Sequence, residues 1–518
     1  MKAQPFPAGR NGHGTRAPEP RTPGPQVSPR FARLLPALLP ALLPVLLLGA
    51  CASFEGIAPA MTQRSPAHYG AQATAVTWPR ADWWTQFGDA QLDALVAQAL
   101  AGNPQLETVQ ARLATAQAAV AGARAALGPR LDLQAQSTWQ RYSEHAIYPP
   151  PLAGSQQFSN NVQVAAAWEF DFFGRHRAAL RAALAGGRAA AAEAQAARVL
   201  VASSVVRSYL ALAQRVQAQA LLAQALEQRT QGRALVQARV ERGLENASAL
   251  RAAEAAIAEL QRQREAVDEQ AQLLRHALAT LAGAGPEATR TLNPRLPEAA
   301  APALPAALPA GLIGRRADLS AARWRVEAAL AGVDAAKARF YPNVNLLAFA
   351  GLQSLGFAHW LDLGSRNLGV GPAISLPIFD AGALRAGLRG REAELDAAVA
   401  GYNSALGEAV RDVADPIASL QSLQKQALAQ RAAQAATQAA LELAEQRFRA
   451  GLAPRDGVIA RQLERLAQAL AASELQARQM DATVALMRAL GGGFDALADD
   501  AAATADPDPG PGLDSASR

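Results

Sequence analysis

Two segments of the chain space their hydrophobic residues as a coiled coil does. Segments 246–282 and 455–490 place apolar residues four and three positions apart in alternation. A sustained period of 3.5 residues requires supercoiled partner helices, so we predict that each segment returns along a long neighbouring helix. One such neighbour is the proline-free stretch 174–242, which at 1.5 Å per residue would reach about 100 Å. The seams contain Leu250, Ala253, Ile257, Leu260, Arg264, Val267, Ala271, Leu274, Leu278 and Leu281, and Ile459, Leu463, Leu466, Leu470, Ser473, Ala477, Met480, Val484 and Met487.

Four shorter segments alternate apolar and polar residues with a period of two, which predicts β-strands with one apolar face. Pro129 and Pro342 end the helices before two of them, because proline lacks an amide donor and clashes with the preceding turn. Four strands are too few to close a barrel, whereas three chains would contribute twelve. The four segments are 131–142, 161–170, 343–352 and 367–379.

The chain contains an internal repeat with a spacing near 210 residues. Residues 104–133 align with 317–346, which places Pro129 on Pro342. Two elongated units of this kind, each unable to bury its apolar face alone, are expected to pack against each other. The sequence therefore predicts a mainly helical fold with a small β part, in which each unit runs helix, two strands, long helix, long helix. The other matching pairs are 170–184 with 376–388 and 237–250 with 445–458.

The single cysteine of the chain follows a signal-like leader. The apolar stretch Leu34–Leu48 comes after a basic region, contains three prolines, and is shorter than the ~20 residues of a bilayer span. Residues 48–51, Leu-Gly-Ala-Cys, resemble the bacterial lipobox, which predicts cleavage before Cys51 and a covalent lipid on it. The alternative is a buried structural cysteine. Ala52 stands where an Asp would favour the inner membrane, so the outer membrane is expected, and no transmembrane helix is predicted after Cys51.

Composition and charge argue against several other classes of protein. Apolar residues make up 50% of the chain and aromatic residues only 5%, which favours helices over a compact α/β enzyme. The formal charge is +6, but residues 1–50 contain six basic residues and one acid and so supply +5 of it. The remaining +1 gives no case for nucleic-acid binding, and one cysteine allows no intrachain disulfide.

No residues are spaced as a catalytic or metal site. The six histidines are scattered, and no nucleophile elbow, P-loop or dinucleotide-binding turn is present. Glu254 and Glu259 fit exposed helix acids better than a catalytic pair. We therefore predict no enzyme activity, no metal, and no cofactor apart from the lipid on Cys51.

Seven motifs in order along the chain resemble the outer-membrane factor of bacterial tripartite efflux pumps, the TolC-like family, and in particular its lipoprotein branch. The resemblance implies a homotrimer whose twelve-stranded barrel in the outer membrane continues into a twelve-helix tunnel across the periplasm. It also implies passive export of small molecules such as drugs, received from a periplasmic adaptor and an inner-membrane transporter of the resistance-nodulation-division type. The motifs are residues 82–106, 169–175, 311–323, 375–382, 408–415, 447–452 and 488–493.

The same resemblance assigns roles to two helix tips and four aromatic residues. Arg-x-x-x-Gly-Leu occurs twice, and in the family this motif is the tip that adaptor hairpins grip. A plain helix-turn-helix without a partner is the alternative, because glycine ends helices generally. Four aromatic residues fit either girdles at the membrane interfaces or ordinary packing. The tip residues are Arg239, Gly243, Leu244, Arg447, Gly451 and Leu452, and the aromatic residues are Trp139, Trp168, Phe349 and Trp360.

The chain departs from the family at the expected periplasmic gate. Members often place acids just after the second tip, but Gly457 and Ala460 stand there, and Arg455 and Asp456 come one position earlier. A ring of Arg455 and Asp456 around a trimer and a solvated turn both remain open. Pro416 also falls within a predicted helix, where it would kink the helix or be absorbed by its neighbours.

The sequence leaves a second function open. A lipid-anchored periplasmic scaffold of coiled coils, without a pore, would have the same seams but no use for the strands. The exported substrate cannot be read from the chain. The predicted divisions are a signal peptide at 1–50, an anchor and equatorial segment at 51–105, a first repeat at 106–282, an equatorial linker at 283–316, a second repeat at 317–490 and a disordered tail at 491–518.

Overall fold

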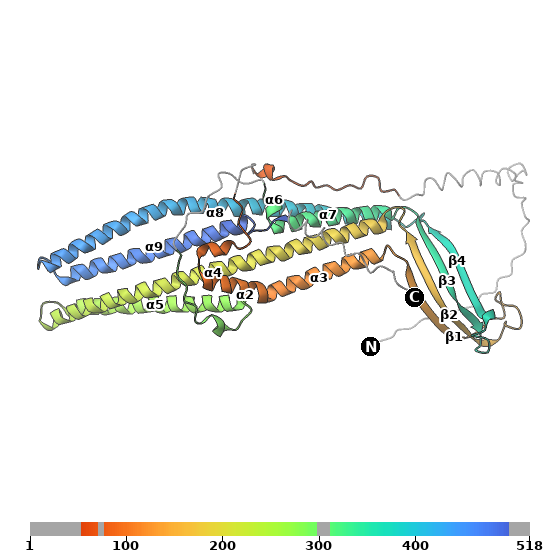
Figure 1. The fold of residues 1–518 in the computed structure, drawn as a ribbon, viewed down its shortest axis with the longest axis horizontal. Helices are drawn as coiled ribbons and strands as arrows, with labels where there is room; N and C mark the ends of the chain where they lie inside the picture. Colours follow the sequence, from red (N-terminus) through yellow and green to blue (C-terminus); the bar gives the residue numbers. More distant parts are fainter. Residues whose placement is uncertain (1–52, 71–76, 298–310, 497–518) are drawn as a thin grey trace, which may run out of the picture.

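The structure of the protein, a computed structural model, describes residues 53–70, 77–297 and 311–496. It is elongated, with long helices side by side over most of its length and a β-sheet at one end (Figure 1). Cys51 and the predicted signal peptide lie outside the described residues.

The two halves of the chain fold into the same series of elements. The first half contains α3 (Pro104–Ala125), β1 (Arg130–Arg141), β2 (Gln156–Phe170), α4 (Arg175–Glu241) and α5 (Ala247–Leu281). The second half contains α7 (Ala317–Ala338), β3 (Asn343–Leu355), β4 (Arg366–Ser375), α8 (Ala383–Arg449) and α9 (Arg455–Ala489). The matching helices have 22, 67 and 35 residues in both halves. This agreement confirms the tandem duplication predicted from the sequence.

The long helices form a wall of four rods that lie side by side. The rods are α3 with α5, α4 alone, α7 with α9, and α8 alone. α3 and α5 lie along one side of α4, α7 and α9 lie along its other side, and α8 packs beyond α7 and α9 (Figure 1). α8 continues as a helix through Pro416, whose side chain is buried. Among the described helices, α4 contains an 18-residue window apolar enough to cross a membrane, and half of that window is buried inside the chain.

Side chains at the helix starts explain where several helices begin. Pro104 occupies the first turn of α3, where its missing amide hydrogen is not needed, and Asn103 accepts a hydrogen bond from the amide of Gln105 at 2.9 Å. At the start of α5, Asn246 accepts in the same way from the amide of Ala249 at 3.1 Å. Both caps satisfy amides that have no partner within the helix.

The strands form one antiparallel sheet in the order β1-β2-β3-β4. One row across the sheet joins Leu133, Val164, Ala350 and Leu368, and the next row joins Gln134, Gln163, Gly351 and Asn367. Because neighbouring rows point to opposite faces, one face is apolar and the other polar, as predicted. The apolar face is uncovered within the chain, where the exposed fractions are 72% for Leu131 and 77% for Val370.

The structure corrects one sequence prediction about the sheet and favours one of the two alternatives for Phe349. The last strand ends at Ser375, so Leu376 and Ile378 of the predicted segment 367–379 lie beyond it. Phe349 lies on the polar face, directly opposite Gly369, where an added Cβ would come within 2.5 Å of its ring. Its role is therefore packing over a glycine, which has no side chain to fill that space.

A belt of short elements crosses the wall near its middle. These are α2 (Ala90–Gly102), α6 (Leu312–Arg315) and the 3₁₀ turns η1 (Pro66–Tyr69), η2 (Trp83–Phe87) and η3 (Pro286–Thr289). Leu92 and Val96 of α2 are fully buried in one cluster with Val205 and Tyr209 of α4. The hydroxyl of Tyr209 also donates to the Asp89 carboxylate at 2.6 Å, which ties α2 to the wall.

The described N-terminal residues run along α8 in an extended strap, residues 53–64. Arg385, in the first turn of α8, donates to the carbonyl of Ser53. Farther along, the amide of Met61 donates to Asp396 at 2.8 Å and the amide of Arg64 donates to Asn403 at 2.8 Å. The strap therefore leads from the sheet end of the wall toward the belt.

Arg316 joins three elements where the second repeat begins. Its side chain is only 9% exposed, and one amino group lies 2.6 Å from Asp318 and 3.1 Å from Asp412 of α8. A second amino group donates to the carbonyl of Ala489 at 3.4 Å. Desolvation would raise the pKa of Asp318, but its hydrogen bonds from Arg316 outweigh this and hold that pKa below its ordinary value.

The chain stays packed beyond the second repeat. Leu490 and Phe494 are buried, and Gly492 lies so close to Val199 of α4 that an added Cβ would come within 2.5 Å of it. Residues 491–494 are thus part of the folded body, and the predicted tail at 491–518 was placed too early. The remainder of that segment, from 497, lies outside the described residues.

We predict that Arg316→Ala destabilises the protein by about 3 kcal/mol, because both carboxylates then lose their shielded partner. The measurement is the free energy of unfolding in detergent, followed by circular dichroism against denaturant. Arg290→Ala is the control, since the Arg290–Glu287 pair is highly exposed and should contribute at most about 1 kcal/mol. Equal losses in the two variants would contradict the role given to Arg316.

Candidate functional site

The first helix tip, between α4 and α5, is closed by Gly243. Its φ of +70° is a left-handed conformation that residues with a side chain rarely adopt. The amide of Gly243 donates to the carbonyl of Val240 at 3.0 Å, and the amide of Leu244 donates to that of Arg239 at 2.9 Å. This pair of bonds is the Schellman motif, which satisfies carbonyls that the end of a helix leaves free.

The second tip, between α8 and α9, repeats this geometry. Gly451 also has a φ of +70°, and the amide of Leu452 donates to the carbonyl of Arg447 at 2.8 Å. The tip leucines project into solvent with exposed fractions of 74% for Leu244 and 76% for Leu452. The predicted tip residues therefore do end the two helical hairpins, and each tip presents one bare leucine.

A bidentate ion pair joins the two tips. Both terminal nitrogens of Arg239, at the end of α4, lie 2.9 Å from the carboxylate oxygens of Asp456, at the start of α9. The hydrogen bonds from Arg239 hold the pKa of Asp456 below its ordinary value of 3.8. The pair is thus formed at neutral pH and is lost only as the pH falls through that lowered pKa. Arg455 donates instead to Gln231 of α4 at 3.1 Å.

The structure does not test a ring of Arg455 and Asp456 around a trimer, which stays a prediction. It shows that both oxygens of Asp456 are engaged within the chain, so the acid is not a freely solvated turn residue. Arg239 was predicted as a tip residue and Asp456 as a gate residue, and the fold brings these two together across 217 positions of sequence.

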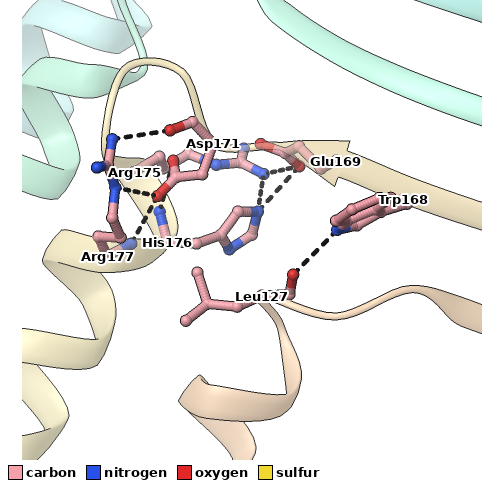
Figure 2. Close-up of polar contacts among 7 residues, drawn as sticks. All are labelled: Leu127, Trp168, Glu169, Asp171, Arg175, His176 and Arg177. Atoms are coloured by element: carbon pink, nitrogen blue, oxygen red, sulfur yellow. Dashed lines mark hydrogen bonds and ion pairs between the residues drawn. The ribbon is translucent and has the colours of Figure 1, made fainter.

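The junction between β2 and α4 is held by Asp171 (Figure 2). Its carboxylate accepts from the amides of His176 at 3.1 Å and Arg177 at 2.8 Å, the first turn of α4. Desolvation would raise the pKa of Asp171, but these backbone bonds and the Arg177 side chain lower it. The carboxylate also matches the positive end of the helix dipole. The strand and helix are therefore fixed to each other by one side chain.

The neighbouring side chains complete the junction. Glu169 forms an ion pair with Arg175, and the Nε2 atom of His176 lies 3.0 Å from the same carboxylate (Figure 2). On the other side of the cluster, the indole nitrogen of Trp168 donates to the carbonyl of Leu127 at 3.0 Å, just after α3 (Figure 2). These contacts connect α3, β2 and α4 at the end of the sheet.

Asp380 plays the same part in the second repeat. Its carboxylate accepts from the amides of Gly382 at 2.9 Å and Leu384 at 2.6 Å, and these bonds lower its pKa. Asp171 and Asp380 each follow a phenylalanine, within the motifs at 169–175 and 375–382. The repeated Phe-Asp pair is the signal from which the two caps were predictable, although the sequence analysis gave them no role.

The chemistry of the described residues is that of caps and ion pairs. No three His, Cys, Asp or Glu side chains gather as a metal site in the ranges that the structure covers. Sequence reasoning also missed the strap along α8, because its contacts use backbone amides and carbonyls that leave no motif.

Similarity to known proteins agrees with this architecture. A model of the family described as outer membrane efflux protein matches residues 95–284 and 308–492, more than half of the chain and all of both repeats.

The chain belongs to the outer membrane efflux protein family.

Individual relatives support the assignment. The multidrug resistance outer membrane protein MdtQ of Escherichia coli is 32% identical over 464 residues, which cover 86% of this chain and 96% of MdtQ. The fusaric acid resistance protein FusA of Burkholderia cepacia is 37% identical over 315 residues, or 60% of this chain and 59% of FusA. The crystal structure of the outer membrane protein VceC of Vibrio cholerae has a TM-score of 0.74 at 35% identity, covering 81% of this chain and all of VceC. The TolC-like fold of this outer membrane efflux protein is thereby confirmed.

We predict opposite effects for two glycines of this outer membrane efflux protein. Gly451→Ala forces alanine into the left-handed conformation and should cost about 1 kcal/mol of unfolding free energy. Gly457→Ala, in the first turn of α9 with no atom near an added Cβ, should instead stabilise by about 0.5 kcal/mol. Denaturant unfolding of the two variants tests this, and a destabilised Gly457→Ala would show that the helix start is constrained in some other way.

Proposed function

We propose that three copies of this chain form an outer-membrane channel that exports small toxic molecules passively. One observation carries the proposal: the four rods and the four strands follow the same order across the chain, and both layers end in free edges. Strand β4 of one copy can pair with β1 of the next, and α8 with α3 and α5 of the next. Closure by threefold symmetry gives twelve strands and leaves no unpaired edge in lipid.

The two faces of the sheet fit such a barrel. The apolar row through Leu133 and Leu368 would face lipid, and the polar row through Gln134 and Asn367 would line a wet interior. Trp139 and Trp168 lie in the apolar rows, on opposite ends of the sheet, where interfacial aromatic girdles are expected. The rods would then continue the barrel as a periplasmic tunnel.

The strap supports a lipid anchor on Cys51. Ser53 lies against the first turn of α8, immediately after the sheet, which places the end of the described chain at the level of the proposed membrane surface. Cys51 precedes it by two residues, at most ~7 Å of extended chain. We propose that the lipid enters the inner leaflet of the outer membrane there.

The tips are the proposed docking point for the rest of a tripartite pump. Leu244 and Leu452 offer exposed apolar groups at both hairpin ends, farthest from the sheet, where an adaptor protein would meet the tunnel. An inner-membrane transporter, proposed to be of the resistance-nodulation-division type, would supply the energy. MdtQ and FusA are named for resistance to drugs and to fusaric acid, so small organic toxicants are the proposed cargo. Catalysis has no part in this scheme.

The ion pair between the tips is the proposed periplasmic latch. Opening the tunnel would require the hairpin α4–α5 and the hairpin α8–α9 to separate at their ends, and the Arg239–Asp456 contact joins these hairpins. A surface pair of this kind is weak, which suits a contact that an adaptor must break.

We expect the purified protein to be a trimer that conducts ions across planar bilayers, and Asp456→Asn to raise its open probability severalfold because the latch is lost. Glu445→Gln is the control, since its partner Arg449 lies on the same helix and joins no hairpins. The wild-type protein should reach the open probability of Asp456→Asn only below pH 3.8. The pKa of Asp456 lies below this ordinary value, and protonation of its carboxylate breaks the latch. A monomer without conductance would instead support the pore-free scaffold.

We also expect Cys51→Ser to abolish incorporation of labelled palmitate, because serine cannot take the place of the thiol, and Ala52→Ser to leave it intact. Membrane fractionation with detection of the label is the measurement. Absence of label on the wild-type protein, or label retained on Cys51→Ser, would contradict the anchor while leaving the channel proposal to the conductance test.

A further inference from the structure

A polar groove of about 400 Å³ lies between α4, α8 and α9. Five charged side chains line it, three arginines and two carboxylates, together with leucines and alanines. The charged residues are Arg207, Arg215, Glu474, Arg478 and Asp481. None of the contacts described above uses this groove.

On both α4 and α9, the residues that line the groove lie on the side of the helix opposite to the residues that contact the belt or the linker. Val205 and Tyr209, which lie in the same buried cluster as α2, are each two residues from Arg207 and so about 200° around the helix from it. On α9, Gln476 donates to the carbonyl of Pro297 in the linker and stands two residues from both Glu474 and Arg478.

Positions around α8 independently show the same arrangement. Asn403 contacts the N-terminal strap, whereas Ser419 and Leu423 line the groove, 16 and 20 residues farther along the helix. At about 100° per residue these positions lie about 160° and 200° around α8 from the strap. All three helices thus place the belt and the strap on one face of the wall and the groove on the other.

Which of these two faces lines the tunnel depends on the proposed function. In a trimeric tunnel the anchored strap and the belt must be outside, so the groove faces the lumen in each of the three copies. A molecule moving through the tunnel passes it.

Two of its arginines are free to bind an anion. Asp481 is neutralised by Arg207, whose side chain contacts it through two hydrogen bonds of 2.5 and 3.0 Å. Among the described residues, Arg215 and Arg478 have no ion pair or hydrogen bond to a side chain or backbone atom. Against them stands only Glu474, so the local charge of the groove is positive.

Most of the uncharged lining is apolar. It consists of Leu210 and Leu423, each 3% exposed, and three alanines, Ala211, Ala477 and Ala482, with Gln214 and Ser419 as the two uncharged polar residues. Guanidinium groups bind carboxylates with matched geometry, and a small apolar wall covers a hydrocarbon body without blocking it. The combination fits a molecule with an anionic end and an apolar end.

We propose that this groove is a transit site for small amphipathic organic anions, in which Arg215 and Arg478 contact the carboxylate and the alanine and leucine side chains contact the apolar body. The site raises the concentration of such anions at the tunnel wall relative to cations of the same size. The channel therefore favours organic acids among the small molecules delivered to it.

The test is the reversal potential of single channels in planar bilayers under gradients of potassium benzoate and of potassium chloride. In the double variant Arg215→Gln, Arg478→Gln the permeability of benzoate relative to potassium should fall about threefold, because two positive charges leave the wall. Chloride, which has no apolar body, should change less. Arg295→Gln is the matched control, since Arg295 is exposed in the linker on the outer face.

Each outcome decides the matter. An unchanged benzoate ratio in the double variant, or an equal fall for benzoate and chloride, would overturn the transit site while leaving the channel intact. The same fall in Arg295→Gln would show a general charge effect and overturn it as well. Wild-type protein without conductance would overturn the proposed channel itself, and with it the path to the groove.

Discussion

Each helical rod of this protein leads directly into one strand, and this direct connection determines the arrangement of everything else. The chain passes from α3 into β1, from β2 into α4, from α7 into β3 and from β4 into α8. Because each connection is short, the order of the rods must equal the order of the strands. Asp171 and Asp380 fix two of these passages by capping the long helices directly after the sheet. A wall and a sheet in the same order are what the proposed closure of three copies into one tube requires.

The duplication makes the two halves alike in length, but their helix tips form different ion pairs. Arg239 of the first tip has Asp456 to bind, whereas the position that corresponds to Asp456 in the first repeat, 208 residues earlier, is Ser248. Within the described residues Arg447 of the second tip forms no ion pair. Within the described residues, only the tip arginine of the first hairpin therefore pairs with an acid of the other hairpin. The halves share a scaffold, and the contact that joins their tips belongs to neither repeat alone.

The elements with a strong period were predictable from the sequence almost to the residue. The proline-free stretch 174–242 became α4 at Arg175–Glu241, because no proline interrupts it and the next helix-ending residue is Gly243. Contacts between distant segments were not predictable in this way. The Arg239–Asp456 pair joins residues that the seams alone do not place together, and the strap binds α8 through backbone groups that every residue possesses. The predicted tail began too early, at 491, because nothing in its composition showed that Gly492 and Gly493 pack closely against Val199 and Ala81.

Alanine and glycine determine how much of the helical wall lacks long side chains. Where rods pack through Ala178, Ala185 and Ala189 of α4, these buried small side chains let the helix axes approach closely. In the proposed tube, small side chains offer few contacts to the molecules inside it. Long polar side chains offer more, and the groove beside Arg215 and Arg478 is proposed to be selective for that reason. The low aromatic content that first separated this chain from compact enzymes is thus the composition of a wall built from small side chains. Most of its positive charge is carried by arginine, and arginines without an acidic partner among the described residues, such as Arg215 and Arg478, are the groups to which the proposed transit site assigns selectivity.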